Sequence, residues 1–280
     1  MVHQDAVLTW GLPQLRDLPW RRTRDPWAVL VSEVMLQQTQ VHRVIPKWLA
    51  FMSAFPSPSH CAAAPLGDVL GLWLGLGYPR RARNLHLAAQ HISSAGEFPQ
   101  TLEGLLTLPG VGAYTARAVL AFAFELDAAV VDTNIARVFA RVGGGRLTTS
   151  QVQSAADEAL AQGDAWAWNQ CLMDLGAQLC RPLHPRCDEC PLLPTCEWHG
   201  EGVDPAVGSA GVSGRQSRFD GSDRQGRGRL MKAVSTGSVV ATAIDVAMGW
   251  PGQHDRAARV AASLVADGLL VVVDEAYQHP

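Results

Sequence analysis

Apolar residues recur at helical spacing along most of the first 200 residues. Residues 27–51 carry apolar side chains every three or four positions, which predicts one amphipathic helix or two consecutive ones. The same spacing predicts further helices over residues 66–73, 81–95, 101–108, 113–125, 133–141, 150–162 and 166–179. No convincing strand pattern occurs before residue 200, so we expect this part to be all-α.

The composition changes after residue 199, where the first predicted domain, residues 1–199, ends. Residues 200–228 are rich in Gly, Ser, Asp and Arg and are expected to form a linker. Two helical patterns follow, near Leu230–Trp250 and Asp255–Ala266, and then an apolar strand over Leu269–Val273. This order predicts a small winged-helix-like module over residues 229–280.

The overall composition is that of a globular protein. The 280 residues are 48% hydrophobic and 18% charged, which fits one large domain or two smaller ones and excludes wholesale disorder. No run of about 18 uncharged apolar residues occurs, so no membrane span is expected. The N-terminus lacks a basic stretch followed by an apolar one, and secretion is therefore not expected. With a net charge of −3, any contact with nucleic acid would depend on local patches.

Four of the six cysteines lie close together, with the spacing C-x6-C-x2-C-x5-C. They are Cys180, Cys187, Cys190 and Cys196. Four close cysteines in a chain without an export signal indicate a metal or iron–sulfur site rather than disulfides. Because zinc sites usually use two short Cys-x-x-Cys pairs and only one is present, the spacing favours one 4Fe–4S cluster, with zinc as the alternative. Cys61 and Cys171 lie among apolar residues and are interpreted as buried.

A glycine-containing turn, Leu-Pro-Gly-Val-Gly-Ala over residues 108–113, is expected between two short helices. Glycine permits positive φ and close backbone approach, and the N–H groups that start the next helix can bind a phosphate without side-chain charge. Gly110, Val111 and Gly112 are therefore candidate contacts to a DNA backbone. An ordinary helix–helix turn remains the alternative, because a Gly-x-Gly pattern alone is a weak signal.

Further motifs stand in order around this turn. They are Pro19-Trp20-Arg21, Ser-Glu-Val-Met-Leu-Gln-Gln-Thr over residues 32–39, Gly-Leu-Gly-Tyr over residues 75–78, Arg-Asn-Leu-His over residues 83–86, Tyr114, Asp132 with Asn134, and the cysteine quartet. Over about residues 16–198 the chain resembles the helix-hairpin-helix DNA glycosylases, and within them the MutY-type adenine DNA glycosylases. The resemblance implies an all-α fold of two helical subdomains with a cluster loop. It also implies hydrolysis of the N-glycosidic bond of adenine mispaired with 8-oxoguanine or guanine.

Cleavage of this bond requires a general acid for the leaving base and a carboxylate near the cationic sugar. Glu33 lies in an apolar helix, where desolvation is expected to raise its pKa, and the resemblance implies that it protonates N7 of the flipped adenine. Asp132 is expected to stay ionised and to stabilise the sugar, with Asn134 beside it. The alternatives are a helix-surface carboxylate for Glu33 and a helix N-cap for Asp132, a role that Asp132 could combine with catalysis.

Tyr114 stands where strand-cleaving relatives carry a lysine that attacks the sugar. The only lysines, Lys47 and Lys232, are far from this position in the sequence. We therefore expect a monofunctional glycosylase that leaves an abasic site.

The target base must leave the helix stack, and side chains must fill the gap. The resemblance implies that Gln38 inserts into the duplex and that Tyr78 wedges near the opposite base, with Leu76 beside it. It also implies adenine or DNA contacts by Trp20, Arg21, Leu36 and Gln170. Core packing remains the alternative for Trp20 and Tyr78.

The C-terminal part departs from the family. Many members carry a Nudix-like domain that helps to recognise 8-oxoguanine, and residues 200–280 are too short for one. We hypothesise that this tail adds only DNA affinity or stability, so that truncation after residue 200 leaves cleavage largely intact. Pro79 also replaces a second aromatic residue that often follows the Gly-Leu-Gly-Tyr motif.

The expected partner is double-stranded DNA that contains A:8-oxoG or A:G mismatches. We expect a monomer in the cytoplasm, associated with the nucleoid when it acts on DNA. Two other functions that involve DNA stay open, besides that of a plain zinc-binding helical module. One is a thymine glycosylase for G:T mismatches, which Glu33 argues against because protonation of N7 is purine chemistry. The other is a non-catalytic iron–sulfur protein that binds DNA.

Overall fold

The computed structural model describes residues 2–160, 162–212 and 218–280. The chain divides into two compact units. The first comprises Met1–Leu30, Gln100–Thr107 and Val111–Arg215, and the second comprises Val31–Pro99, Leu108–Gly110 and Gln216–Pro280. None of the helices in the described ranges is long and apolar enough to cross a membrane.

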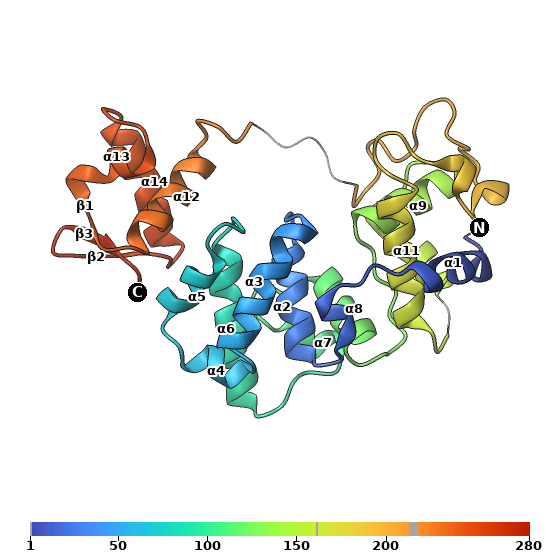
Figure 1. The fold of residues 1–280 in the computed structure, drawn as a ribbon, viewed down its shortest axis with the longest axis horizontal. Helices are drawn as coiled ribbons and strands as arrows, with labels where there is room; N and C mark the ends of the chain where they lie inside the picture. Colours follow the sequence, from blue (N-terminus) through green and yellow to red (C-terminus); the bar gives the residue numbers. More distant parts are fainter. Residues whose placement is uncertain (1, 161, 213–217) are drawn as a thin grey trace. The chain divides into compact units, whose positions relative to one another are not determined.

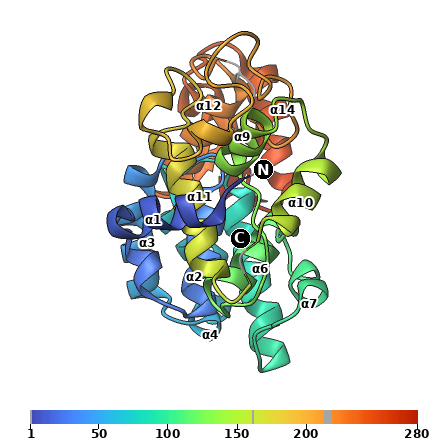
Figure 2. The same cartoon turned by 90° about the vertical axis from the view of Figure 1, so that its right-hand side faces the viewer.

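The first unit is helical. Its α-helices are α1 (Gln4–Gly11), α7 (Leu102–Leu106), α8 (Ala113–Phe122), α9 (Thr133–Val142), α10 (Thr149–Glu158) and α11 (Ala165–Gln178). Helix α11 packs against α1, α8 and α9, and Figure 2 shows α1 and α9 beside it. Gly11 permits the close approach of α1, because a Cβ there would lie 2.6 Å from the Cys171 sulfur.

The second unit begins within α2 (Pro26–Leu36), which runs on from the first. It continues through α3 (Val41–Ala54), α4 (Pro58–Ala63), α5 (Leu66–Trp73) and α6 (Arg80–Ala95). Helix α6 packs against both α4 and α5 (Figure 1). The core is aromatic at its centre, where the Phe51 ring meets Phe55 and Trp73 edge to face, with centroids 5.1 and 6.3 Å apart.

A C-terminal module completes the second unit. It consists of α12 (Asp223–Val234), β1 (Val239–Val240), α13 (Ile244–Met248), α14 (His254–Ala266), β2 (Val271–Val273) and β3 (Ala276–Gln278). The strands form an antiparallel sheet in the order β1-β3-β2. Ala276 of β3 pairs with both Val240 of β1 and Val273 of β2, so β3 is the central strand of the sheet.

The helices predicted between residues 27 and 179 are confirmed, with ends that differ by a few residues. Residue 161, within the predicted helix 150–162, lies outside the described residues. Residues 27–51 form two helices, and no strand occurs among the described residues before 200. The sequence pattern missed α1 and α4. Both are short, and a short helix offers few periodic positions.

The helical pattern predicted near Leu230–Trp250 forms two helices, α12 and α13, that are interrupted by β1. Helix α12 ends at Val234, and the β-branched Val239 and Val240 then pair with β3. Helix α12 also starts at Asp223, inside the range expected as a linker, because the Ser222 hydroxyl accepts a hydrogen bond from the Gln225 N–H and caps it. Residues 213–217 of that expected linker lie outside the described residues.

Candidate active site

Asp132 caps the N-terminus of α9, as the alternative interpretation of this residue predicted. Its Oδ1 accepts hydrogen bonds from the backbone N–H groups of Asn134 (2.9 Å) and Ile135 (2.7 Å). Its Oδ2 accepts one from the Asn134 side-chain amide (2.8 Å). Both carboxylate oxygens are therefore fixed, and Asn134 lies directly beside Asp132, as expected.

The electrostatic environment of Asp132 combines two opposing effects. Burial raises the pKa of Asp132, and the hydrogen bonds from Ile135 and Asn134 and the charge of Arg137 only partly oppose this effect. Ionised Asp132 is thus less stable in the folded protein than an exposed aspartate. A carboxylate that is weakly solvated and fixed in direction is well suited to stabilise a nearby cation.

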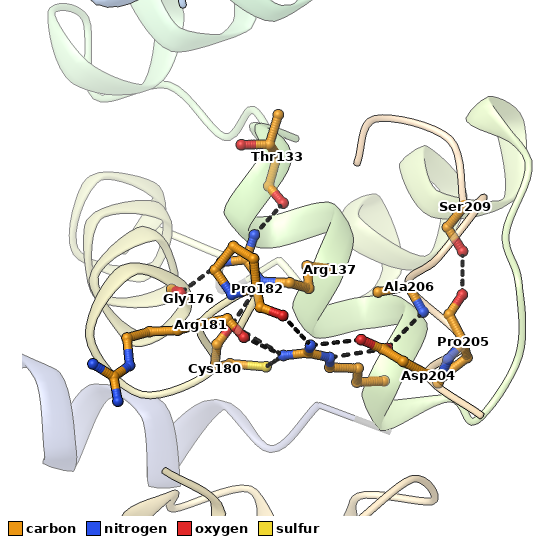
Figure 3. Close-up of polar contacts among 11 residues, drawn as sticks. Thr133, Arg137, Gly176, Cys180, Arg181, Pro182, Asp204, Pro205, Ala206 and Ser209 are labelled. Carbon is orange, nitrogen blue, oxygen red and sulfur yellow. Dashed lines mark hydrogen bonds and ion pairs between the residues drawn. The ribbon is translucent and has the colours of Figure 1, made fainter. Parts of the chain in front are cut away.

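Arg137 connects Asn134 to the cysteine loop. Its guanidinium donates to the Asn134 Oδ1 (2.8 Å), to the Gly176 carbonyl (2.6 Å) and to the Cys180 carbonyl (2.6 Å). Figure 3 shows the contacts of Arg137 with Gly176, on α11, and with Cys180. Helix α11 comes this close because Gly176 has no side chain, and a Cβ there would lie 2.6 Å from that of Asn134. The polar chain therefore runs from Asp132 to the first cysteine of the quartet.

Arg141, one turn further along α9, is almost fully buried at the same loop. It donates to the Cys180 sulfur (3.4 Å) and to the Arg181 carbonyl (2.8 Å), and it pairs with Asp204 at 2.7 Å (Figure 3). Its guanidinium also lies 4.4 Å from the centre of the Trp198 ring. The segment after the last cysteine is thus packed against α9, although the sequence predicted a linker from residue 200 onward.

All four cysteines of the quartet line one pocket of mainly apolar residues. All are free thiols, and burial raises the pKa of Cys190 to about 11 and also raises the pKa of Cys180 and Cys187. Within the described ranges, no three or more His, Cys, Asp or Glu side chains are already arranged to hold a metal ion. A metal bound here would have to displace the thiol protons.

Cys61 and Cys171 are fully buried, as predicted. Burial raises the pKa of Cys61 to about 12 and that of Cys171 to about 11. Both thiols are therefore protonated at neutral pH and pack as small apolar groups.

Arg21 and Trp20 lie in the first unit, in a short 3₁₀ turn over Pro19–Arg22. Trp20 is buried, and the Arg21 guanidinium makes a two-pronged ion pair with Asp174 of α11 at 2.9 and 2.8 Å. Burial acts to raise the pKa of Asp174, but hydrogen bonds from Arg21 and Arg16 outweigh it and hold that pKa below its usual value. Asp174 was not predicted from the sequence, although an aspartate within an apolar helix pattern was a usable signal.

Gln170 and Asn169 are buried side by side on α11. The Asn169 side chain accepts from the Val130 N–H (2.9 Å) and donates to the Ala128 carbonyl (2.9 Å). These bonds fix the extended segment that leads to Asp132. Asn169 therefore positions the site from behind, a role that sequence reasoning did not assign.

The remaining predicted residues lie on other elements. Glu33 is in α2 and only 4% exposed, which contradicts the helix-surface alternative. Tyr114 is in the first turn of α8, two residues after Gly112, which is the N-cap of this helix. Gly110 has a φ of +78° and packs on Asn84, where a Cβ would lie 2.7 Å from the Asn84 Cβ. Val111 is buried.

Two loops of the second unit carry the other residues. Leu36 ends α2 and is half-buried, and Gln38 follows it and is exposed. Leu76 is buried, whereas Tyr78 is 37% exposed immediately before α6. Arg81 donates hydrogen bonds to both loops and was not singled out from the sequence.

The family model and the related proteins that match this chain all point to the same protein family. Residues 31–162 match the HhH-GPD superfamily of base excision DNA repair proteins. The chain is 41% identical to an adenine DNA glycosylase of Mycolicibacterium smegmatis over 274 residues, which cover 94% of this chain and 91% of that protein. It is 39% identical to the human adenine DNA glycosylase over 208 residues, which cover 68% of this chain and 38% of that protein.

Solved structures give the same fold. A thermostable thymine-DNA glycosylase superposes with a TM-score of 0.65 at 29% identity, covering 70% of this chain and 94% of that one. A non-covalent complex of endonuclease III with DNA superposes with a TM-score of 0.62 at 24% identity, covering 71% of this chain and 98% of the other. The second similarity concerns the fold alone. The mycobacterial similarity extends much further along the chain than these and includes most of the C-terminal module.

Proposed function

The chain belongs to the adenine DNA glycosylases of the HhH-GPD superfamily, and on this premise we propose that it excises adenine mispaired with 8-oxoguanine or guanine in double-stranded DNA. The observation that carries the proposal is the local environment of two carboxyl groups, those of Glu33 and Asp132. Glu33 is buried in an apolar helix, and Asp132 is fixed through both of its oxygens. Their environments suit the acid and the cation-stabilising carboxylate that glycosidic cleavage requires.

In the proposed reaction Glu33 donates a proton to N7 of the extruded adenine, which turns the base into a better leaving group. Asp132 stabilises the positive charge that develops on the sugar as the bond to the base breaks. Asn134 keeps the Asp132 carboxylate oriented, because its side-chain amide donates to Oδ2. Water then completes hydrolysis at the sugar carbon.

We propose that the enzyme is monofunctional. Tyr114 stands at the start of α8, and a phenol does not form a Schiff base with the sugar. The two lysines stand on other helices, with Lys47 half-buried on α3 and Lys232 exposed on α12. The expected product is an abasic site in an intact strand.

The four cysteines would hold one 4Fe–4S cluster. In favour of this proposal, all four line one pocket, and the Arg141 guanidinium donates to the sulfur of Cys180, as suits a thiolate ligand. A bound cluster would cross-link the loop through four thiolates. Zinc remains the alternative, and iron and acid-labile sulfide analysis distinguishes the two.

DNA contacts are proposed at four places. The backbone of Gly110, Val111 and Gly112 would bind a phosphate, and the Gln38 and Tyr78 loops would enter the duplex with Leu36 and Leu76 behind them. Trp20 and Gln170 would line the adenine pocket, where Arg21 acts through its ion pair with Asp174. We also propose that residues 223–280 are winged-helix-like, because their element order and the β1-β3-β2 sheet suit that fold.

The decisive experiment is single-turnover adenine release from an A:8-oxoG duplex by wild type and Glu33→Gln. We expect wild type to release adenine, and Glu33→Gln to bind the duplex but to react about 10²–10⁴-fold more slowly, because that is what a general acid contributes. Glu158→Gln, an exposed glutamate at the end of α10, is the matched control and should react like wild type.

Duplexes with A:G and T:G pairs complete the assay. Cleavage of T:G but not of A:8-oxoG by wild type would replace the proposal with the thymine glycosylase alternative. Tight binding without release of any base would favour the non-catalytic alternative.

A further inference from the structure

The loops that carry Gln38 and Tyr78 share an unusual backbone conformation. Gln38 has a φ of 54° and Tyr78 a φ of 49°, in the left-handed region. A non-glycine residue enters this region at an expense of about 1–2 kcal/mol, so surrounding contacts must maintain it. Such strain is common where a protein holds a ligand-clamping element in a set geometry.

Arg81, in the first turn of α6, makes these contacts on the α2 side. Its Nη1 donates to the carbonyls of Val34 (2.8 Å), Met35 (3.2 Å) and Gln37 (2.5 Å). These carbonyls belong to the end of α2 and to the residue before Gln38. The guanidinium thus satisfies backbone acceptors that the end of a helix leaves open, at the point where the chain turns to positive φ.

The other guanidinium nitrogen of Arg81 serves the second loop. Its Nη2 donates to the carbonyls of Leu76 (3.1 Å) and Gly77 (3.0 Å), immediately before Tyr78, and to the Thr39 hydroxyl (3.2 Å). The guanidinium carbon also lies 5.5 Å from the centre of the Tyr78 ring. One planar group therefore binds the backbone on both sides of the gap between the loops.

Thr39 provides a second, direct link. Its hydroxyl lies within hydrogen-bond distance of the Leu76 carbonyl (3.2 Å), and it also meets the Arg81 Nη2. Burial lowers the pKa of Arg81 to about 10, so the guanidinium remains charged at neutral pH. A lysine would carry the charge but could not reproduce the fork of donors, because its ammonium is a single point.

We propose that Arg81 is a positioning residue that joins the Gln38 and Tyr78 loops into one rigid two-pronged wedge, so that insertion of either side chain into a mismatched duplex fixes the other. This inference rests on the proposed function, because it takes Gln38 and Tyr78 as the inserted residues. Arg81 itself touches neither the base nor the sugar. Its effect is a coupling between the side chains of Gln38 and Tyr78.

A mutant cycle in two backgrounds tests the coupling. Gln38→Ala, Tyr78→Ala and the double variant are made with Arg81 and again with Arg81→Lys. Dissociation constants are measured for a duplex in which a non-cleavable 2′-fluoro-adenosine faces 8-oxoguanine. Arg117→Lys, a half-buried arginine that pairs with Asp157 in the first unit, is the matched control background.

In the wild-type and Arg117→Lys backgrounds, we expect a coupling factor of about tenfold, as for groups in one network. This factor is the ratio between the change in dissociation constant in the double variant and the product of the two single changes. With Arg81→Lys the factor should fall to about one, because the loops then respond independently. Additive effects with Arg81, or an unchanged factor with Arg81→Lys, would overturn the proposal.

Thr39→Val provides a milder background. It tests the coupling even if the Arg81→Lys variant does not fold. It removes one acceptor of Arg81 and the direct link to Leu76, with little change in volume. We expect an intermediate coupling factor of about threefold. A factor equal to that of wild type would count against a shared wedge.

The inference and the proposed function fail in different ways. If wild type releases no adenine from A:8-oxoG, the proposed function fails regardless of the cycle. If wild type releases adenine and binds the uncleavable duplex while the loops act additively, only the inference about Arg81 fails.

Discussion

The polar contacts at α9 and those that link the C-terminal module to α6 and the Tyr78 loop differ in burial. At α9, the side chains of Arg137 and Arg141 are buried, and each donates several hydrogen bonds. Arg137 binds the carbonyls of Gly176 and Cys180, and Arg141 binds the carbonyl of Arg181. In the module, Arg224 reaches the Tyr78 hydroxyl at 3.4 Å, and Asp267 lies 3.6 Å from Arg80, whose side chain is 70% exposed.

This difference indicates different tasks. Removal of one partner from a buried ion pair leaves a charge without solvent and destabilises a protein by about 3–5 kcal/mol. An exposed pair contributes about 0–1 kcal/mol. We therefore expect changes around α9 to abolish catalysis or metal retention, and changes at the module to alter binding only slightly.

The largest expected effect belongs to Asp132→Asn. It should lower single-turnover adenine release by about 10³-fold, because the neutral amide no longer stabilises the cationic sugar. The fold should persist, since asparagine is also a good N-cap residue. Asp157→Asn, on α10, is the control and should react like wild type. A Asp132→Asn variant within tenfold of wild type would remove Asp132 from the mechanism.

The raised pKa of Asp132 gives the same variant a pH signature. A carboxyl whose pKa is raised by folding contributes stability below its unfolded pKa, about 3.9, and loses it as the pH rises through the folded value. Wild type should therefore gain stability relative to Asp132→Asn as the pH falls from 7 toward 4. Thermal unfolding of both proteins across this range measures the difference, and an opposite trend would mean that folding lowers this pKa.

The next largest effect concerns the Arg141–Asp204 pair. Asp204→Asn should destabilise the cysteine loop by about 2 kcal/mol, because the buried guanidinium loses its counter-charge but keeps its carbonyl acceptors. We expect bound metal to be lost about tenfold faster to a chelator, followed by metal analysis and visible absorption. Glu189→Gln removes an exposed ion pair with Arg186 in the same loop and should retain metal like wild type. Equal retention in Asp204→Asn would show that this pair does not support the site.

The sequence predicted most helices and the cap at Asp132, because both depend on local patterns. It did not predict Arg81, Arg137 or Arg141, whose partners are mainly backbone carbonyls distant in sequence and leave no periodic signal. Arg137 and Arg141 did carry a hint, since both interrupt a helix that is otherwise apolar from Ile135 to Val142.

The expected linker was the other main difference. Composition suggested a free segment from residue 200, but Asp204 pairs with Arg141, and the Ala210 N–H donates to the Leu147 carbonyl (2.9 Å). Gly- and Ser-rich composition does not report such specific contacts. A truncation that tests the tail should therefore end after residue 212, because a cut after residue 200 would also remove Asp204.

The smallest expected effect is that of Arg224→Gln in the module. Its contact with the Tyr78 hydroxyl is long and lies at the surface, so affinity for an A:8-oxoG duplex should change by less than about threefold and stability by less than about 0.5 kcal/mol. Tyr78→Phe removes the same contact from the other side and should give an equally small change. The preference for 8-oxoguanine over guanine opposite adenine is the measurement that could contradict the expected difference between α9 and the module. A tenfold loss of that preference in Arg224→Gln would mean that the module reads the opposite strand through Tyr78, and that exposure alone does not separate the two regions.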